Sequence, residues 1–271
     1  MLVPEYAAFL YNVKLRDVRL AAQRHCSYPA GEQYVELRAP SGRTRMERSV
    51  VVTGAAGALG RAVVTEFRGR GLEVIALDRA GDPLDELGDQ DGVHPLAMDL
   101  ADRAAVQQGW AAVDDLGTPS SLVALAGGFT PGSLADLDAD TLDGLWRSNV
   151  SSLVWCCQAA APRMAAAGGG AIVAVGSKTA ISGSAPVAHA ASKAAVVRVA
   201  ALLAEELRPQ RIRVNAVLPS VIDTPANRVW MSADLAARAV APAAIAKVIA
   251  FLCSEDAAPI SGASVPVYGD A

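Results

Sequence analysis

The residues best suited to chemistry lie in one helical stretch of the chain. His189 and Lys193 stand four positions apart in Ala188-His189-Ala190-Ala191-Ser192-Lys193, and this spacing puts two side chains on one helix face, one turn apart. A free imidazole has a pKa of about 6.5, and a nearby ammonium group lowers it further. His189 is therefore expected to be mostly neutral at pH 7, able to accept a proton from an alcohol but a poor donor to a carbonyl.

Two more polar residues complete a candidate catalytic set. Ser177 comes just after the apolar run Ala171–Val175, separated from it by one glycine, and Asn149 lies inside a long helical pattern. Structural roles stay open for three of the four residues. Ser177 would then cap a helix or turn, His189 would be an ordinary helix residue facing a cleft after loss of catalysis, and Lys193 would serve cofactor binding alone.

A glycine-rich turn offers a place for a dinucleotide. Glycines 54, 57 and 60 in Val51-Val52-Thr53-Gly54-Ala55-Ala56-Gly57-Ala58-Leu59-Gly60 follow a short β-branched run and open a helix. Such a turn lets the backbone approach a pyrophosphate, and the helix N-terminus supplies N–H donors. Asp78 after the next strand suits ribose hydroxyls and would repel a 2′-phosphate, which favours NAD. Arg79 could bind that phosphate instead, so NADP is the alternative.

The elements that position these residues alternate along the chain. Strand patterns are predicted at 49–52, 73–77, 93–97, 121–126, 171–175, 213–217 and 264–267, and helical patterns at 61–70, 102–115, 138–167, 185–207 and 242–253. This alternation predicts an α/β fold, a Rossmann-type doubly wound parallel sheet with helices on both faces. Ligands of such sheets bind beyond the carboxyl ends of the strands, where the motifs above are expected to gather.

Residues 49–271 resemble the short-chain dehydrogenase/reductase family. Thr53-Gly54…Gly60 is similar to its cofactor turn, and Asp99 in Met98-Asp99-Leu100 to the acid that contacts adenine. Ala126-Gly127 resembles the end of the family's Asn-Asn-Ala-Gly element, with Ala124 and Leu125 in place of both asparagines. Pro219…Thr224 is similar to the segment that holds the nicotinamide carboxamide, with Ser220 for the usual glycine. Ser261-Gly262…Val265-Pro266-Val267 resembles the C-terminal strand.

The resemblance implies a role for each candidate. Ser177 would hydrogen-bond the substrate oxygen, Asn149 would hold a relay water, and Lys193 would bind the nicotinamide ribose. His189 stands where the family has its catalytic tyrosine, so the chain is identified as an atypical member, and the serine-to-histidine separation is about one residue shorter than usual. The implied cofactor-binding residues are Thr53, Gly54, Gly57, Ala58, Leu59, Gly60, Asp78, Arg79, Asp99, Leu100, Ala126, Gly127, Lys193, Pro219, Ser220 and Thr224.

The expected function is an NAD(P)-dependent oxidoreductase that transfers a hydride between nicotinamide and a small carbonyl or alcohol. The alternative is a dinucleotide-binding regulator or scaffold without redox chemistry, and a third option uses bound NAD in an elimination or epimerisation. Ser177, Asn149 and Lys193 together favour the enzyme, because a binder needs only the lysine. In the predicted substrate lid, Trp230 and Met231 could form an apolar wall and Arg228 could meet an anion; otherwise Trp230 covers core surface and Arg228 is solvated or pairs with Asp223.

Composition limits the other possibilities. The 271 residues are 52% hydrophobic and 19% charged, with a net charge of -4, which suits one large α/β domain and gives no reason to expect nucleic acid or an anionic membrane as a partner. The four cysteines have no metal-binding spacing, so buried free thiols and no metal site are expected. No apolar stretch looks long and uninterrupted enough to span a bilayer and no signal peptide is evident, so a cytoplasmic location is expected.

The chain divides into residues 1–48, an N-terminal extension, and residues 49–271, the NAD(P)-binding domain. The extension has three interpretations: an appendage that packs on the domain or a partner, a loosely ordered tail, or a segment upstream of a natural start at Met46. Two long alanine-rich helices at 138–167 and 185–207 correspond to a dimer interface in the family. The resemblance thus implies a homodimer or homotetramer.

Overall fold

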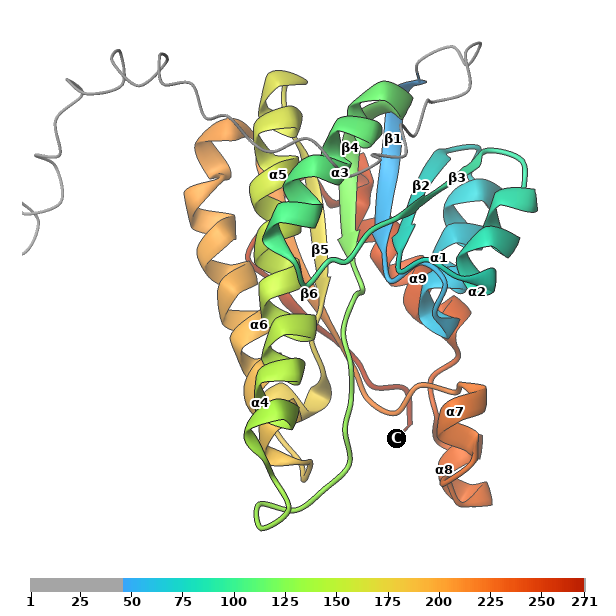
Figure 1. Cartoon of the computed structure of the whole chain (residues 1–271), viewed down its shortest axis with the longest axis vertical. Coiled ribbons are helices and arrows are strands. Elements are labelled where there is room, and N and C mark those ends of the chain that lie inside the picture. The colour runs from blue at the N-terminus through green and yellow to red at the C-terminus, as the bar shows by residue number, and fades with distance from the viewer. Residues whose placement is uncertain (1–45, 271) are drawn as a thin grey trace, which may run out of the picture. The chain divides into compact units, whose positions relative to one another are not determined.

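Seven parallel strands form the centre of the molecule (Figure 1). The structure is a computed structural model that describes residues 46–270, so the interpretations of residues 1–45 lie outside the described part. The sheet order is β3-β2-β1-β4-β5-β6-β7. The strands are β1 (Met46–Thr53), β2 (Glu73–Asp78), β3 (Val93–Ala97), β4 (Gly117–Ala124), β5 (Gly170–Val175), β6 (Ile212–Pro219) and β7 (Ser264–Val267). The predicted Rossmann-type α/β fold is confirmed.

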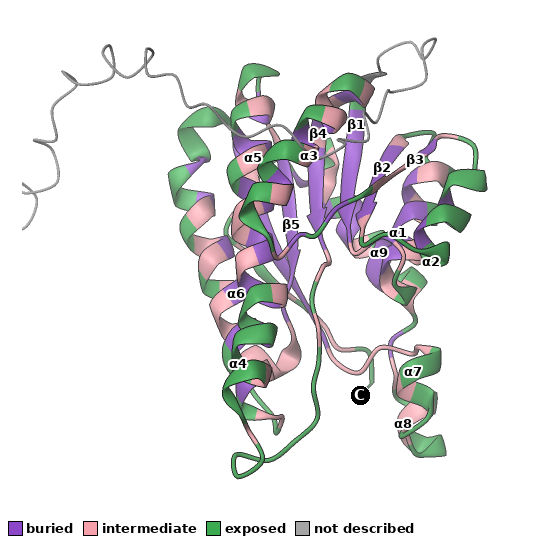
Figure 2. Ribbon diagram, in the orientation of Figure 1, coloured by how far each residue is buried: buried purple, intermediate pink, exposed green. Residues whose placement is uncertain are grey.

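Helices cover both faces of this sheet. The longer ones are α1 (Ala58–Gly69), α3 (Arg103–Leu116), α5 (Ser152–Ala166), α6 (Val187–Glu206) and α9 (Pro242–Cys253), and the shorter ones are α2 (Asp82–Asp85), α4 (Ala139–Trp146), α7 (Pro225–Arg228) and α8 (Ala233–Arg238). Val51 packs with residues of α3, α5 and α6, whereas its neighbours Val50 and Val52 pack with α1 and α9. The central strands therefore alternate between two cores, as a sheet buried on both faces requires, and Figure 2 shows β1, β4 and β5 largely buried.

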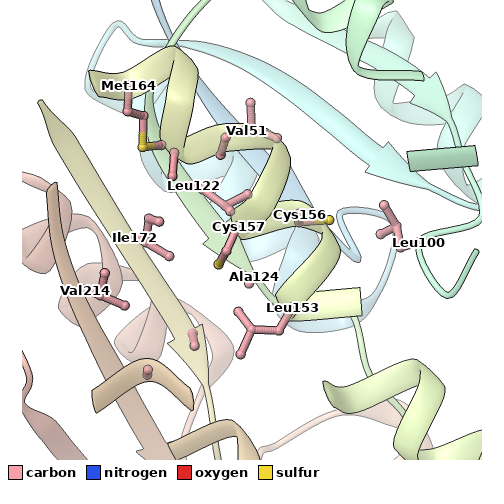
Figure 3. Close-up of a cluster of buried hydrophobic side chains, with 14 of the residues drawn as sticks. Val51, Leu100, Leu122, Ala124, Leu153, Cys156, Cys157, Met164, Ile172 and Val214 are labelled. Atoms are coloured by element: carbon pink, nitrogen blue, oxygen red, sulfur yellow. The ribbon is translucent and has the colours of Figure 1, made fainter. Parts of the chain in front are cut away.

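Strand register builds the core beneath α5. Val51, Leu122, Ile172 and Val214 are partners across four adjacent strands and form one apolar row. The side chains of α5, Cys157 among them, pack against this row in Figure 3. The three cysteines in the described part are free, as expected, and burial raises the pKa of Cys156 to about 12.

Several predicted boundaries differ from those in the structure; the strand predicted at 121–126, for instance, is β4 at Gly117–Ala124. The first strand begins at Met46, three residues before the predicted start at Ser49. The predicted helix over 138–167 is interrupted, because α4 ends at Trp146 and a π-helical turn, η2 (Arg147–Ser151), precedes α5. A π-helical turn accommodates one extra residue without breaking the helix axis, so hydrophobic periodicity does not reveal it. This turn holds Asn149.

The length of α6 corrects another expectation. It is long and apolar enough, by length and composition alone, to cross a membrane. Its buried residues include Ser192 and Lys193, and it packs beside β5 and β6 in the same core as α5. A core helix of this kind passes the length and hydropathy test without spanning a bilayer, so α6 by itself is weak evidence for a membrane span.

Candidate active site

The candidate residues gather where the strand order reverses. β1 pairs with β2 on one side and with β4 on the other, and the chain leaves these strands in opposite directions across the sheet. A crevice outside the carboxyl ends is expected at such a point. The carboxyl ends of β1 to β6 and the segments that follow them contain all the predicted site residues except Asn149 and the two on α6.

The turn after β1 is shaped for close approach. Gly54 has a φ of +66°, and a Cβ there would lie 2.9 Å from the backbone nitrogen of Ala126. A Cβ at Gly60 would collide with the Gly54 and Ala55 carbonyls. Gly57 precedes α1 and provides no side-chain cap, which leaves the N–H groups of Ala58, Leu59 and Gly60 to bind an anion. These features fit the pyrophosphate of a dinucleotide.

Thr53 has a different role from the predicted cofactor contact. Its side chain is 1% exposed, and its hydroxyl accepts hydrogen bonds from the backbone N–H groups of Leu125 and Ala126, both at 3.1 Å. The hydroxyl therefore ties the end of β1 to the segment after β4. Thr53 positions Ala126 and Gly127 from inside the fold.

Asp78 lies beside the glycine turn, as the placement of an adenosine-binding acid requires. Its carboxylate accepts hydrogen bonds from the backbone N–H groups of Ala56 (2.9 Å) and Arg79 (2.8 Å). After β3, Asp99 accepts from the N–H of Ala101 at 3.0 Å, and Leu100 is buried in the core. Asp78 is thus held against the turn by the backbone, and Arg79 is the next residue in the chain.

The side-chain amide of Asn149 binds both backbone polar groups of Gly128, in the segment after β4. Its amide oxygen accepts from the N–H of Gly128 at 2.8 Å, and its amide nitrogen donates to the Gly128 carbonyl at 3.2 Å. The same nitrogen donates to the Ser192 hydroxyl (2.9 Å), which in turn donates to the His189 carbonyl (2.8 Å). Asn149 is 2% exposed. Sequence reasoning missed Ser192, because only the fold places its hydroxyl against Asn149.

Lys193 is buried under the same segment. It is 8% exposed, and its Nζ donates to the Val175 carbonyl at 2.9 Å. Burial lowers its pKa to about 8. A Cβ at Gly127 would lie 3.3 Å from Nζ and would clash with the Asn149 amide. Only a residue without a side chain leaves room for both groups there.

His189 is half-buried one turn before Lys193. Its imidazole packs edge-on against the Phe129 ring, with 5.0 Å between ring centroids and 73° between planes. Burial, and then the Lys193 ammonium, lower the pKa of His189, while the Gly128 carbonyl acts in the opposite direction. Its Nδ1 is buried and has no hydrogen-bond partner among the described residues.

Ser177 lies two residues beyond Val175, whose carbonyl binds Lys193. Its hydroxyl accepts from the N–H of Thr179 at 3.2 Å and shares a hydrogen bond with the Thr179 hydroxyl at 2.8 Å. It therefore caps the short helical turn Lys178–Ala180. The structure brings the end of β5 together with Lys193, and no hydrogen bond joins Ser177 to His189.

The segment after Pro219, which ends β6, is tied to the last described residues. The Ser220 hydroxyl donates to the Tyr268 carbonyl at 2.6 Å, and Thr224 caps α7 by accepting from the N–H of Asn227 at 3.2 Å.

In the predicted lid, both carboxylate oxygens of Asp223 accept hydrogen bonds from Arg228, at 2.5 and 2.7 Å. This pairing confirms one of the two interpretations of Arg228. Trp230 is 59% exposed, so the interpretation that it covers core surface is wrong. The described residues contain no group of three or more acidic, histidine or cysteine side chains able to hold a metal ion.

Comparisons with known proteins agree with this geometry. Residues 48–234 match the family described as short chain dehydrogenase. The chain is 33% identical over 235 residues to D-threitol dehydrogenase of Mycolicibacterium smegmatis, covering 81% of this chain and 90% of that protein. It is 30% identical to L-xylulose reductase of Mus musculus (82% and 95% covered) and to meso-2,3-butanediol dehydrogenase of Serratia marcescens (82% and 93%).

Solved structures show the same relationship. An oxidoreductase from Burkholderia thailandensis superposes with a TM-score of 0.76 at 30% identity, covering 83% of this chain and 92% of that one. ElxO with NADP bound has a TM-score of 0.78 at 23% identity, with 83% and 98% covered, and shares the fold. The chain therefore belongs to the short-chain dehydrogenase/reductase family and is an oxidoreductase of the kind that uses NAD(P).

Proposed function

We propose that the enzyme oxidises small secondary alcohols with NAD and that His189 accepts the substrate proton. The observation that carries the proposal is the pairing of His189 with the buried Lys193 on one face of α6 beside Gly127 and Gly128. A lowered imidazole pKa keeps His189 neutral at pH 7. Neutral imidazole accepts a proton well and donates one poorly, so alcohol oxidation is favoured over carbonyl reduction.

Each residue has a role in this scheme. Bound NAD would supply the hydride acceptor. Lys193 would hold the nicotinamide ribose hydroxyls, and Ser177 would donate a hydrogen bond to the substrate oxygen. His189 would take the hydroxyl proton at Nε2, because Nδ1 is closed off by burial. Asn149 fixes the backbone of Gly128 and thereby the wall next to the imidazole.

The cofactor preference rests on Asp78. Its carboxylate lies beside the glycine turn, where it would accept hydrogen bonds from the two ribose hydroxyls of NAD and repel the 2′-phosphate of NADP. The remaining cofactor contacts would come from the α1 N-terminus, Asp99 and the segment from Pro219 to Thr224. The neighbouring Arg79 could bind the 2′-phosphate of NADP and would thereby weaken the preference for NAD.

The substrate class is a small molecule with neighbouring oxygens. The relatives named above are D-threitol, L-xylulose and meso-2,3-butanediol enzymes, and each of these compounds carries oxygen on adjacent carbons. The pairing of Arg228 with Asp223 neutralises the lid cation, so an uncharged substrate is favoured over an anionic one. We also propose a homodimer or homotetramer, formed through α5 and α6.

The test compares the wild-type enzyme with His189→Phe and His189→Tyr variants. NADH and NADPH binding is followed by fluorescence, and turnover is measured from pH 5 to 9 with meso-2,3-butanediol, threitol and the corresponding ketones. His189→Phe should lower kcat for oxidation by about 100-fold or more and leave NADH affinity within about twofold. His189→Tyr should restore carbonyl reduction at neutral pH. His94→Gln removes a histidine far from the site and serves as the control.

The pH profile has a definite sign. Oxidation needs neutral His189, so kcat/KM should fall as pH drops below a value under the ordinary histidine pKa of 6.5. It also needs charged Lys193, so kcat/KM should fall again as pH rises through about 8. Full turnover by His189→Phe, or a profile without the acid limb in wild type, would contradict the assignment. NADH binding without turnover by any variant would favour a cofactor-binding regulator.

A further inference from the structure

A cavity lies at the amino end of the sheet, opposite the candidate active site. Its volume is about 840 Å³, and it is formed where β1, β4, β5 and β6 begin and where α1 and α9 end. The charged residues among the described ones that line it are Arg48, Arg70, Arg208, Arg211, Arg213 and Glu255. Five guanidinium groups and one carboxylate make this cavity strongly basic, and nothing in the oxidoreductase chemistry uses it.

The fold itself accounts for three of these arginines. Arg213 donates to the carbonyls of Leu252 (2.8 Å) and Ser254 (3.0 Å) at the end of α9, where a cation offsets the helix dipole. Arg70 binds the Glu66 carboxylate and Arg208 binds the Glu205 carboxylate, both at 2.7 Å. These contacts explain why the three side chains are present without any ligand.

Arg48 and Arg211 have no such explanation. Both are exposed, and neither forms a hydrogen bond or ion pair through its side chain with any described residue. Arg211 also has a φ of 58°, the only positive φ outside glycine in the described part of the chain. That region favours glycine or asparagine and costs other residues about 1 kcal/mol. Arg211 takes this conformation as the cap of the short turn Arg208–Gln210, so the fold accounts for its backbone. The guanidinium groups of Arg48 and Arg211, which bind no other described side chain or carbonyl, are available to a ligand in the cavity.

The two arginines flank the cavity from opposite sides. Arg48 is in β1 and Arg211 immediately precedes β6, with β4 and β5 between them. Three strand spacings separate their backbones by about 14 Å, a gap that two long side chains can narrow around a ligand. The walls between them include Val50, Phe67 and Ile212. The volume is in the range of small-molecule sites.

We propose that this cavity binds an organic anion with at least two phosphate or carboxylate groups, held at its two ends by Arg48 and Arg211. Guanidinium groups pair with these oxyanions through two parallel hydrogen bonds, and two separated arginines select for two separated charges. The apolar wall accommodates the carbon skeleton between the charged groups. The site is independent of the proposed alcohol oxidation, and its test does not rely on turnover.

The test is a calorimetric titration of the full-length chain with tripolyphosphate at low ionic strength. Saturating NADH is present throughout, so that the phosphate-binding turn after β1 is already filled. Tripolyphosphate should bind at one site per chain and at least tenfold more tightly than orthophosphate, which presents a single anionic group. The double substitution Arg48→Gln and Arg211→Gln should weaken tripolyphosphate binding at least tenfold.

Two further variants make the result decisive. Arg147→Gln with Arg198→Gln removes two exposed charges elsewhere and should leave the affinity within twofold. Arg211→Gly allows the positive φ without strain, so it should keep or raise the unfolding temperature while it weakens tripolyphosphate binding. Each of three results would overturn the proposal. The wild-type chain would not bind tripolyphosphate, the Arg147 and Arg198 variant would lose as much affinity as the Arg48 and Arg211 variant, or Arg211→Gly would bind with unchanged affinity.

Discussion

Lys193 illustrates a conflict between stability and chemistry at the level of a single residue. Its ammonium is buried and has one hydrogen bond, to the Val175 carbonyl. Burial lowers its pKa from the ordinary 10.5 to about 8, a difference equivalent to about 3 kcal/mol against the charged form at neutral pH. The fold therefore tolerates Lys193 rather than depending on it, as is usual for functional groups in a site.

Replacing Lys193 should stabilise the protein without cofactor. Allowing about 1 kcal/mol for the lost hydrogen bond, Lys193→Met should raise the free energy of unfolding at pH 7 by about 2 kcal/mol. Because the unfolded chain binds the extra proton between pH 8 and 10.5, wild-type stability should rise with pH across that window, and the variant should lack this rise. Urea unfolding at pH 7 and 10 measures both effects.

The control for this prediction is Lys247→Met, which removes an exposed lysine from α9. It should change the free energy of unfolding by less than about 0.5 kcal/mol at either pH. A Lys193→Met variant that is less stable than wild type at pH 7 would show that the buried ammonium contributes to the fold.

At the scale of elements, the site depends on backbone segments that side chains from other elements hold in place. Thr53 at the end of β1 binds the segment after β4, and Asn149 in the π-helical turn binds Gly128 in the same segment. Asp78 at the end of β2 binds the turn after β1. The backbone that follows each of these strands is thus held by a side chain from another element rather than by residues of its own segment.

Cofactor choice belongs to this scale, because Asp78 both holds the turn and carries charge. Asp78→Asn keeps an acceptor for the N–H of Ala56 but removes the negative charge. The ratio of NADPH to NADH affinity should rise about tenfold or more, since the 2′-phosphate is no longer repelled and Arg79 is adjacent. Fluorescence titration with both nucleotides measures the ratio.

Asp99→Asn provides the matched comparison, because Asp99 also accepts a backbone hydrogen bond but is assigned to the adenine. Its NADPH to NADH ratio should stay within about twofold of wild type. Equal changes in both variants would mean that Asp78 does not discriminate between the nucleotides.

At the scale of the whole molecule, residues 46–270 contain the seven-stranded sheet, both buried clusters and every candidate site residue. Deletion of residues 1–45, leaving Met46 as the start, should therefore give a chain that folds and binds NADH with unchanged affinity. Its unfolding temperature should stay within about 4 °C of the full chain, a shift of about 1 kcal/mol or less. Calorimetry and NADH titration test this, and a deletion that fails to fold would favour an extension that packs on the domain.

The sequence by itself determined the alternation of strands and helices, the glycine turn after β1 and the spacing of His189 and Lys193. These depend on local periodicity and on residue types that backbone geometry demands. Only the tertiary structure decided that Asn149 binds Gly128 and that the buried Thr53 hydroxyl binds the backbone after β4. It also decided that Lys193 is buried and that Arg48 and Arg211 line one cavity. Those facts depend on which strand ends are neighbours, and the order β3-β2-β1-β4-β5-β6-β7 brings together residues far apart in the chain that no local pattern connects.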